Sequence, residues 1–174
     1  MKSDYIYREA CRVKRKFDTR NPFKLAEKMG IHVLLNYDFD NLKGMYTVIQ
    51  RNRFIFINGN LSERDRITVC AHELGHDRLH RKAAQLKAFQ NFMLWCKHQN
   101  PENEANIFAS HLLIDDNEIL SLVNDYDYDS ASLACALNVD INYVLIKIEE
   151  LKKRGYKLKA PYIPKSDFLR GSLT

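Results

Sequence analysis

Two histidines and a glutamate near the middle of the chain have types and a spacing that could support metal chemistry. They form the pattern His72-Glu73-x-x-His76. On an α-helix, residues four apart project from the same face, so both imidazoles could bind one metal ion, most often zinc. Glu73 directly follows the first histidine and could act as a general base on a water molecule at that metal. The pattern therefore predicts a zinc-dependent hydrolase.

The residues around this pattern predict a helix over 64–79, with Ser62 as its N-cap. The alternative is an exposed helix that carries two incidental histidines. We favour the metal site, because chance rarely produces the five-residue pattern in a chain with only six histidines. Cys70 lies two residues before His72, which places it across the helix from the ligand face, so we do not expect it to bind the metal.

A catalytic zinc site needs a third protein ligand. The extended pattern H-E-x-x-H-x-x-G-x-x-H is excluded, because Leu79 and Lys82 stand where it requires glycine and histidine. The other common arrangement takes a glutamate from a second helix further along the chain. Residues 101–113 predict such a helix, with Asn100 as its cap and Pro101 at its first position.

Two glutamates lie in the first turn of that second helix, Glu102 and Glu104. Asn106 lies one turn after Glu102 on the same face, where it could hydrogen-bond the free ring nitrogen of a ligand histidine. This geometry favours Glu102 as the third ligand and leaves Glu104 as the alternative. His80 lies one turn after His76. We expect it to form hydrogen bonds in the same cleft rather than to bind the metal.

These segments resemble the ImmA/IrrE family of metallopeptidases. The likeness is carried by Cys-Ala-His-Glu-Leu-Gly-His at 70–76 and by E-x-x-A-N-x-F-A-x-x-L-L at 102–113. It covers most of the chain, from about Pro22 to Leu113, and extends more loosely to about Gly155. One departure is Asp115, where the family often has proline. This difference concerns the loop after the helix and not the ligands.

The resemblance implies both the site and the activity. The zinc ligands of the family fall on His72, His76 and Glu102, and its catalytic glutamate falls on Glu73. ImmA-like members are encoded on mobile elements or prophages, and they cleave a partner helix-turn-helix repressor so that the genes of the element are expressed. The resemblance therefore implies a small peptidase whose substrate is a repressor.

The length and composition allow one domain with a core and a small helical appendage. The chain has 174 residues, of which 45% are hydrophobic, and no apolar run is long enough to cross a membrane. The first residues contain no apolar segment of a secretory signal, so we expect a cytoplasmic protein. None of the four cysteines forms a C-x-x-C pair, and in a reducing compartment they are expected to be buried or half-buried free thiols.

The charge is distributed unevenly along the chain. The net charge is +5, yet residues 99–146 contain nine acidic residues and no lysine or arginine. The flanking segments therefore carry all 27 basic residues. An acidic region beside the site would attract the basic DNA-binding domain of a repressor. The basic N-terminal helix expected over 5–17 is interpreted as a solvated face, because no nucleic-acid module accompanies it.

The expected fold class is α+β. A short helix over 21–30 precedes three strands, at 31–35, 44–49 and 54–58, which short loops would join into an antiparallel sheet. This sheet would pack on the H-E-x-x-H helix and on the glutamate-bearing helix. We expect a zincin-like core over 1–114, a helical subdomain over 115–155 and an extended tail over 156–174.

Three further segments bear on substrate binding. An extended substrate could pair with the strand Met45–Ile49 or with Phe54–Ile57. The aromatic stretch in 81–99 is interpreted as core packing, with a mobile wall of the cleft as the alternative. Residues 130–137 and 141–154 have helix-turn-helix spacing, but the first two turns of the second helix contain no basic residue. Direct binding of nucleic acid is therefore not predicted.

The leading hypothesis is a zinc-dependent endopeptidase that cleaves a repressor. The alternatives are a non-catalytic regulator that binds a repressor or DNA, and a component associated with a toxin or antitoxin. A peptidase also needs a donor for the developing oxyanion. The candidates for that donor are Tyr46, Tyr126, Tyr128 and His80.

Overall fold

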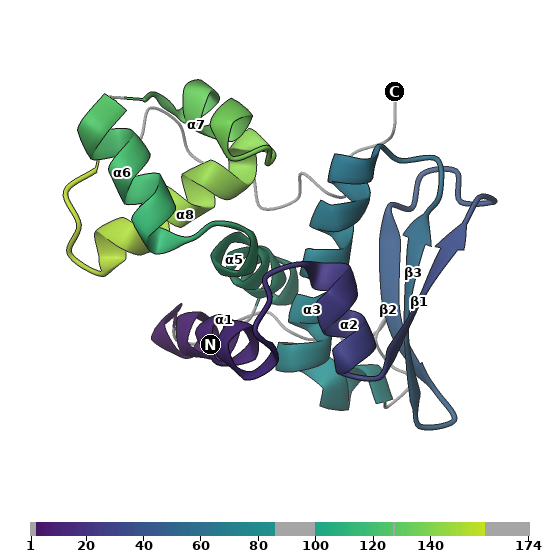
Figure 1. The fold of residues 1–174 in the computed structure, drawn as a ribbon. Coiled ribbons are helices and arrows are strands. Elements are labelled where there is room, and N and C mark those ends of the chain that lie inside the picture. Colours follow the sequence, from purple (N-terminus) through teal and green to yellow (C-terminus); the bar gives the residue numbers. More distant parts are fainter. Residues whose placement is uncertain (1–2, 86–99, 127, 159–174) are drawn as a thin grey trace.

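The computed structural model describes residues 3–85, 100–126 and 128–158. In this part of the chain, a three-stranded sheet has the helices on one of its two sides (Figure 1). Helices α2 and α3 cover the inner face of the sheet, α5 lies between α3 and the group α6 to α8, and α1 lies beside α5. In chain order the elements are α1 (Ser3–Phe17), α2 (Pro22–Lys28), β1 (Ile31–Asn36), β2 (Gly44–Ile49), β3 (Asn52–Asn58), α3 (Glu63–Gln85), α5 (Pro101–Leu113), α6 (Asp116–Tyr126), α7 (Ser130–Ala136) and α8 (Ile141–Lys153).

The sheet is mixed, and the expectation of a purely antiparallel sheet is wrong. Its strand order is β1-β3-β2, with β1 parallel to β3 and β2 antiparallel to β3. The loop after β1 therefore crosses to the opposite edge of the sheet, where β2 lies, and the chain then returns to form the central strand β3. Asn58 holds this loop, because its buried side-chain amide donates to the carbonyls of Phe39 (3.0 Å) and Leu42 (3.1 Å).

A two-residue turn joins β2 to β3. Gln50 and Arg51 have φ values of 49° and 67°, the left-handed pair that matches the twist of a hairpin. The turn is thus shorter than the gap between the expected strands 44–49 and 54–58, and β3 starts at Asn52. Because β3 is central and paired on both sides, the prediction that a substrate could pair with Phe54–Ile57 is also wrong.

The two faces of the sheet differ in burial. Tyr46, Ile55 and Ile57 are buried on the face toward α3. On the opposite face His32 stacks on Phe54, with ring centroids 5.1 Å apart.

The helix boundaries follow the capping residues. Ser62 Oγ accepts from the backbone N–H of Asp65 (3.2 Å), which confirms it as the cap of α3, although α3 continues to Gln85, beyond the expected end. Asn100 Oδ1 accepts from the N–H of Asn103 (3.1 Å) and begins α5 as expected. Asn21 caps α2 in the same way. These caps set where the site-bearing helices start.

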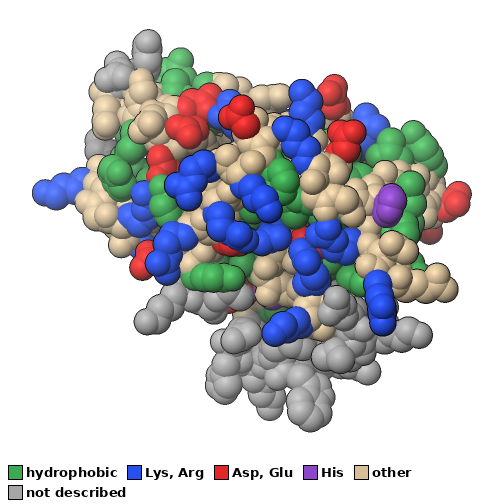
Figure 2. Space-filling view, turned by 60° about the horizontal axis from the view of Figure 1, so that its bottom comes forward, with side chains coloured by type: hydrophobic (Ala, Val, Ile, Leu, Met, Phe, Trp, Pro, Cys, Tyr) green, Lys and Arg blue, Asp and Glu red, His purple; other side chains and the backbone are tan. Residues whose placement is uncertain are grey.

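Helix α1 is amphipathic and carries much of the basic charge. Its buried side, which includes Ile6 and Val13, belongs to the core, and α1 packs on α5. Its exposed residues include Arg8, Arg12 and Arg15. Figure 2, in which the underside of Figure 1 comes forward, shows lysine and arginine gathered across the middle of that face. The interpretation of α1 as a solvated basic face agrees with this exposure.

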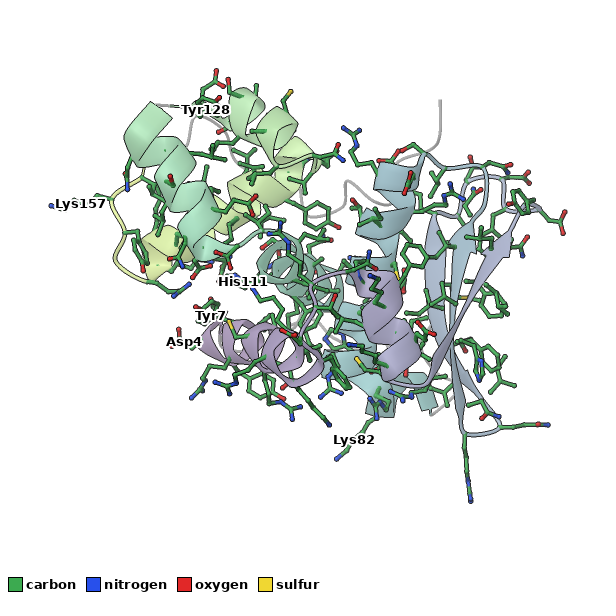
Figure 3. The ribbon with its side chains drawn as sticks, in the orientation of Figure 1. Asp4, Tyr7, Lys82, His111, Tyr128 and Lys157 are labelled. Atoms are coloured by element: carbon green, nitrogen blue, oxygen red, sulfur yellow. The ribbon has the colours of Figure 1, made fainter. Side chains whose placement is uncertain are left out.

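A buried polar network ties α8 to α1, α5 and α6. Lys147 of α8 is fully buried, and its ammonium group contacts Asp116 and lies 3.2 Å from Nδ1 of His111. Arg154 also donates to Asp116 (2.6 Å), and it lies over the ring of Tyr7. Tyr7 and His111 meet edge to face between these helices, with centroids 5.0 Å apart (Figure 3). The C-terminal helices are therefore anchored by charge as well as by apolar contacts.

Helix α8 is not presented as a DNA-reading helix. Tyr143, Val144, Leu145, Ile146, Lys147 and Ile148 are all buried, so most of its first two turns face protein. Among the described residues no single helix is long and apolar enough to cross a membrane, and α7 with α8 passes that test only as a pair bent by 112°. Cys11, Cys70 and Cys135 are free thiols, as expected, but the expectation of burial is wrong for Cys135, which is exposed on the short helix α7. The aromatic stretch over 86–99 and the tail after 158 lie outside the described residues.

Candidate metal centre

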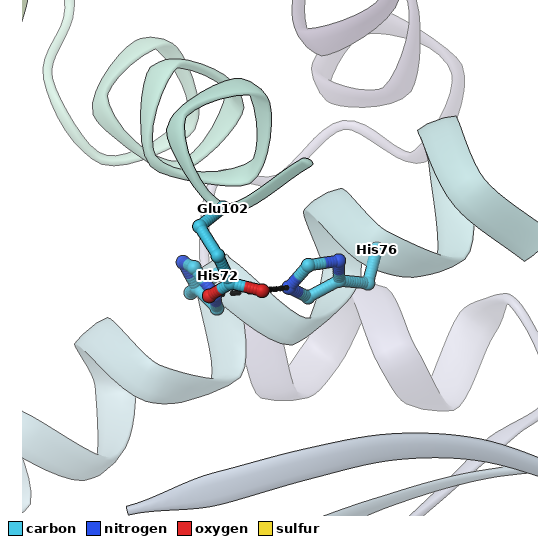
Figure 4. A group of neighbouring side chains, drawn as sticks. All are labelled: His72, His76 and Glu102. Carbon is cyan, nitrogen blue, oxygen red and sulfur yellow. Dashed lines mark hydrogen bonds and ion pairs between the residues drawn. The ribbon is translucent and has the colours of Figure 1, made fainter. Parts of the chain in front are cut away.

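Three side chains from two helices converge where α3 packs against α5. His72 and His76 project from one face of α3, and Glu102 comes from the first turn of α5 (Figure 4). The two Nε2 atoms are 3.0 Å apart. The Glu102 carboxylate lies 3.5 Å from His72 Nε2 and 3.6 Å from His76 Nε2. Within the described part of the chain, this is the group of ligand atoms close enough together, all within 4.8 Å, to hold one metal ion.

The donor set fits a divalent cation. His72 Nδ1 lies 2.7 Å from Asn106 Oδ1, and an amide oxygen only accepts, so Nδ1 carries the proton and Nε2 presents a lone pair. This confirms the predicted hydrogen bond of Asn106. Burial lowers the pKa of His72, but the carboxylates of Glu102 and Glu73 outweigh it and raise that pKa. The carboxylates around His72 therefore favour a positive charge between the two histidines and Glu102.

The structure also separates the two candidate glutamates. Glu104 is not in the group formed by His72, His76 and Glu102, and its carboxylate lies 2.9 Å from Nε2 of His80. His80 Nδ1 in turn lies 3.2 Å from Nδ1 of His76. His80 thus hydrogen-bonds beside the ligand set, as expected. The alternative of Glu104 as the third ligand is not supported by the geometry.

Glu73 lies beside the ligand group, at the edge strand β2. Burial raises its pKa to about 7, the charge of His72 opposes this rise, and the charge of Glu102 adds to it. A general base works best when its pKa is near the working pH. A Cβ added at Gly44 would lie 3.2 Å from Glu73 Oε1 and 2.3 Å from Cγ1 of Val69. Gly44 therefore lets β2 approach α3 closely enough to touch the carboxylate.

Gly75 lets helices α3 and α5 cross closely. A Cβ at this position would lie 2.9 Å from Cα and 3.0 Å from the carbonyl oxygen of Ala105. Both atoms belong to the backbone of α5, which cannot move as a side chain can. The separation of His72 and His76 from Glu102 therefore depends on the glycine between the histidines.

We expect Gly75→Ala to lower the free energy of unfolding by about 1–3 kcal/mol, as overpacking does, and to weaken zinc binding. The added methyl would push α5, and Glu102 with it, away from the histidines. Urea unfolding and a zinc titration measure the two effects. The double variant with Ala105→Gly should not restore zinc binding, because the closest contacts involve the backbone. Full restoration would contradict this explanation.

The sequence did not identify a tyrosine that the structure brings to the site. Tyr143 of α8 is fully buried, and its hydroxyl donates to Asn106 Oδ1 (3.4 Å). Burial, and then the charges of Asp140, Glu73 and Glu102, raise its pKa well above the usual value. No spacing signal could have found it, because Tyr143 lies in an apolar run more than sixty residues after Glu73.

The predicted oxyanion donors are placed elsewhere or are otherwise engaged. Tyr46 is buried and donates to Asp77 Oδ1 (2.8 Å). Tyr128 is exposed at the far end of the C-terminal helices (Figure 3). His80 is bonded to His76 and Glu104. The side chain of Tyr126 lies outside the described residues.

The fold and the clustered residues agree with what sequence comparison finds. The Peptidase_M78 family, described as the IrrE N-terminal-like domain, matches residues 26–149. The chain belongs to this family. It is also 37% identical over 105 residues to "uncharacterized immunity region protein 2" of Bacillus phage phi105. That match covers 60% of this chain and 65% of the phage protein, which is less than two thirds of its length.

Proposed function

We propose that this protein is a zinc-dependent endopeptidase that cleaves a helix-turn-helix repressor. The observation that carries the proposal is the convergence of His72, His76 and Glu102, with the buried Glu73 beside them. Membership of the Peptidase_M78 family supports the same activity. The relative from the immunity region of a phage supports the proposal that the substrate is a repressor of phage or mobile-element genes.

Each residue of the centre has a separate task in this proposal. His72, His76 and Glu102 would hold the zinc, which when bound would acidify a water molecule and polarise the scissile carbonyl. Glu73 would take the proton of the attacking water and deliver it to the leaving amine. Asn106 would keep the proton of His72 on Nδ1, so that Nε2 stays free to bind.

An extended substrate segment would lie along β2. This strand is at the edge of the sheet and packs against α3. Its first residue, Gly44, adjoins Glu73. A segment paired with Met45–Ile49 by main-chain hydrogen bonds would pass beside the ligand group. The structure thus supports one of the two predicted strands.

The direct test is incubation of the zinc-loaded protein with the repressor encoded nearest to it. We expect two repressor fragments from a single cleavage, and none with a chelator or with Glu73→Gln. Mass spectrometry identifies the bond that breaks. An intact repressor that nevertheless stays bound to the zinc-loaded protein would contradict the peptidase proposal and would favour regulation by binding.

The acidic segment provides a test of substrate attraction. Asp129 is exposed and caps α7, since its carboxylate accepts from the N–H of Ser132 (2.8 Å). The side chains of Asp125 and Asp127 lie outside the described residues. Changing all three to asparagine preserves the cap acceptor but removes three charges. We expect slower cleavage and a weaker dependence on salt. Unchanged rates across ionic strengths would contradict attraction by this segment.

A further inference from the structure

We propose that His80 and Glu104 are positioning residues of the metal centre, which together hold His76 in the tautomer and orientation that a metal ion requires. The inference rests on the proposed zinc site. It concerns two residues that neither bind the metal nor take part in proton transfer to the substrate.

The two residues form a buried chain that starts at a metal ligand. His76 Nδ1 lies 3.2 Å from His80 Nδ1, and His80 Nε2 lies 2.9 Å from Glu104 Oε2. His76, His80 and Glu104 are exposed by only 3%, 7% and 6%. Their exclusion from water means that each polar atom depends on its protein partners. The chain also connects the two ligand-bearing helices, because His76 and His80 lie on α3 and Glu104 lies on α5.

The carboxylate at the end of the chain determines the position of each proton. An ionised carboxylate only accepts, so His80 must present Nε2–H to Glu104. A neutral His80 then has a lone pair on Nδ1, which accepts from Nδ1–H of His76. His76 consequently presents its Nε2 lone pair toward His72 and Glu102, as metal binding requires.

The opposite tautomer shows why this matters. If His80 carried its proton on Nδ1, it would donate to Nδ1 of His76. The proton of His76 would then lie on Nε2, pointing into the ligand group and blocking coordination. Glu104 disfavours this tautomer of His76, although it contacts only His80, because its carboxylate needs the proton on Nε2 of His80. His72 is controlled separately, since its Nδ1–H is held by Asn106.

Zinc affinity, measured by competition with a chromogenic chelator, tests the assignment. We expect Glu104→Leu and His80→Leu to weaken zinc binding by about ten- to a hundredfold, the usual effect of losing such a partner. Glu104→Gln and His80→Asn keep an accepting oxygen and should recover a large part of that loss. His32→Leu, on the far face of the sheet, is the matched control and should leave the affinity unchanged.

The outcomes separate this inference from the proposed function. Unaltered affinity in both leucine variants, or no recovery in the conservative variants, would overturn the positioning role alone. Failure of the unchanged protein to bind zinc would overturn the metal centre together with this assignment. Long-range ¹H–¹⁵N spectra of the unchanged protein provide a reading that needs no variant to fold. They should show the Nδ1–H tautomer for His76 and the Nε2–H tautomer for His80, and the reverse assignment would overturn the proposal.

Discussion

Substituting Glu73 by glutamine is expected to leave zinc binding intact and to slow peptide cleavage by about a hundred- to ten-thousandfold, the range that general acid–base catalysis contributes. Glutamine has the same shape but cannot accept a proton from water at neutral pH. Glu73 is not among the three converging ligand residues, so the metal should remain. Zinc content and the rate of repressor cleavage, measured on the same preparation, check the two expectations.

His72→Ala is the informative comparison for this experiment, because it removes a ligand and should lose both zinc and cleavage. A Glu73→Gln protein that cleaves at the original rate would show that another group is the base. A Glu73→Gln protein that loses its zinc would instead mean that Glu73 helps to hold the metal. Either result would contradict the roles proposed for these residues.

The second large effect is expected in stability and not in catalysis. Asp116→Ala should lower the free energy of unfolding by about 3–5 kcal/mol, because it leaves the fully buried ammonium of Lys147 without its carboxylate. Lys147→Met should cost less, about 1–3 kcal/mol, since Asp116 keeps Arg154 and Tyr7 as donors. Urea unfolding at neutral pH measures both variants.

The matched control for Asp116→Ala is Arg20→Ala, which breaks an exposed ion pair between the loop after α1 and helix α6. Arg20 and Glu118 have side chains that are 53% and 42% exposed, so this change should cost less than about 1 kcal/mol. Equal losses from Asp116→Ala and Arg20→Ala would contradict the special role of the buried network.

Acid should reveal the same network. Burial alone would raise the pKa of Asp116 and Glu150, but Lys147 and Arg154 outweigh it at Asp116. His111, Lys153 and Ser3 lower the pKa of Glu150 from 4.5 to about 2. Carboxyl groups with depressed pKa values stabilise the fold above their unfolded pKa and lose that contribution as pH falls. Stability should therefore decline between about pH 4.5 and 2.

Local signals in the sequence predicted the elements that carry the site. Ser62 and Asn100 are capping residues, and each begins the helix predicted from it. The four-residue spacing of His72 and His76 needs only a helix to bring both rings together. Asn106 could be assigned to a ligand histidine because helical spacing places it on the face of Glu102, and in the structure that histidine is His72. These inferences succeeded because they depend on contacts within one helix, or between the H-E-x-x-H helix and the glutamate-bearing helix.

The features that were missed depend on long-range packing. The parallel pairing of β1 with β3 requires the loop after β1 to cross the sheet, which the strand patterns alone do not determine. Tyr143 reaches the site because α8 docks on α5, a contact with no marker in the sequence. The choice of Glu102 over Glu104 was not missed, because the position of Asn106 already favoured Glu102, and the contact of Glu104 with His80 agrees with that choice.

The most direct test of the central claim is anomalous diffraction at the zinc edge, from crystals grown with one equivalent of zinc. We predict one strong peak per chain, within about 2.0–2.2 Å of Nε2 of His72, Nε2 of His76 and a carboxylate oxygen of Glu102. A peak coordinated by other side chains, or no peak between these three, would contradict the claim that they form a metal centre.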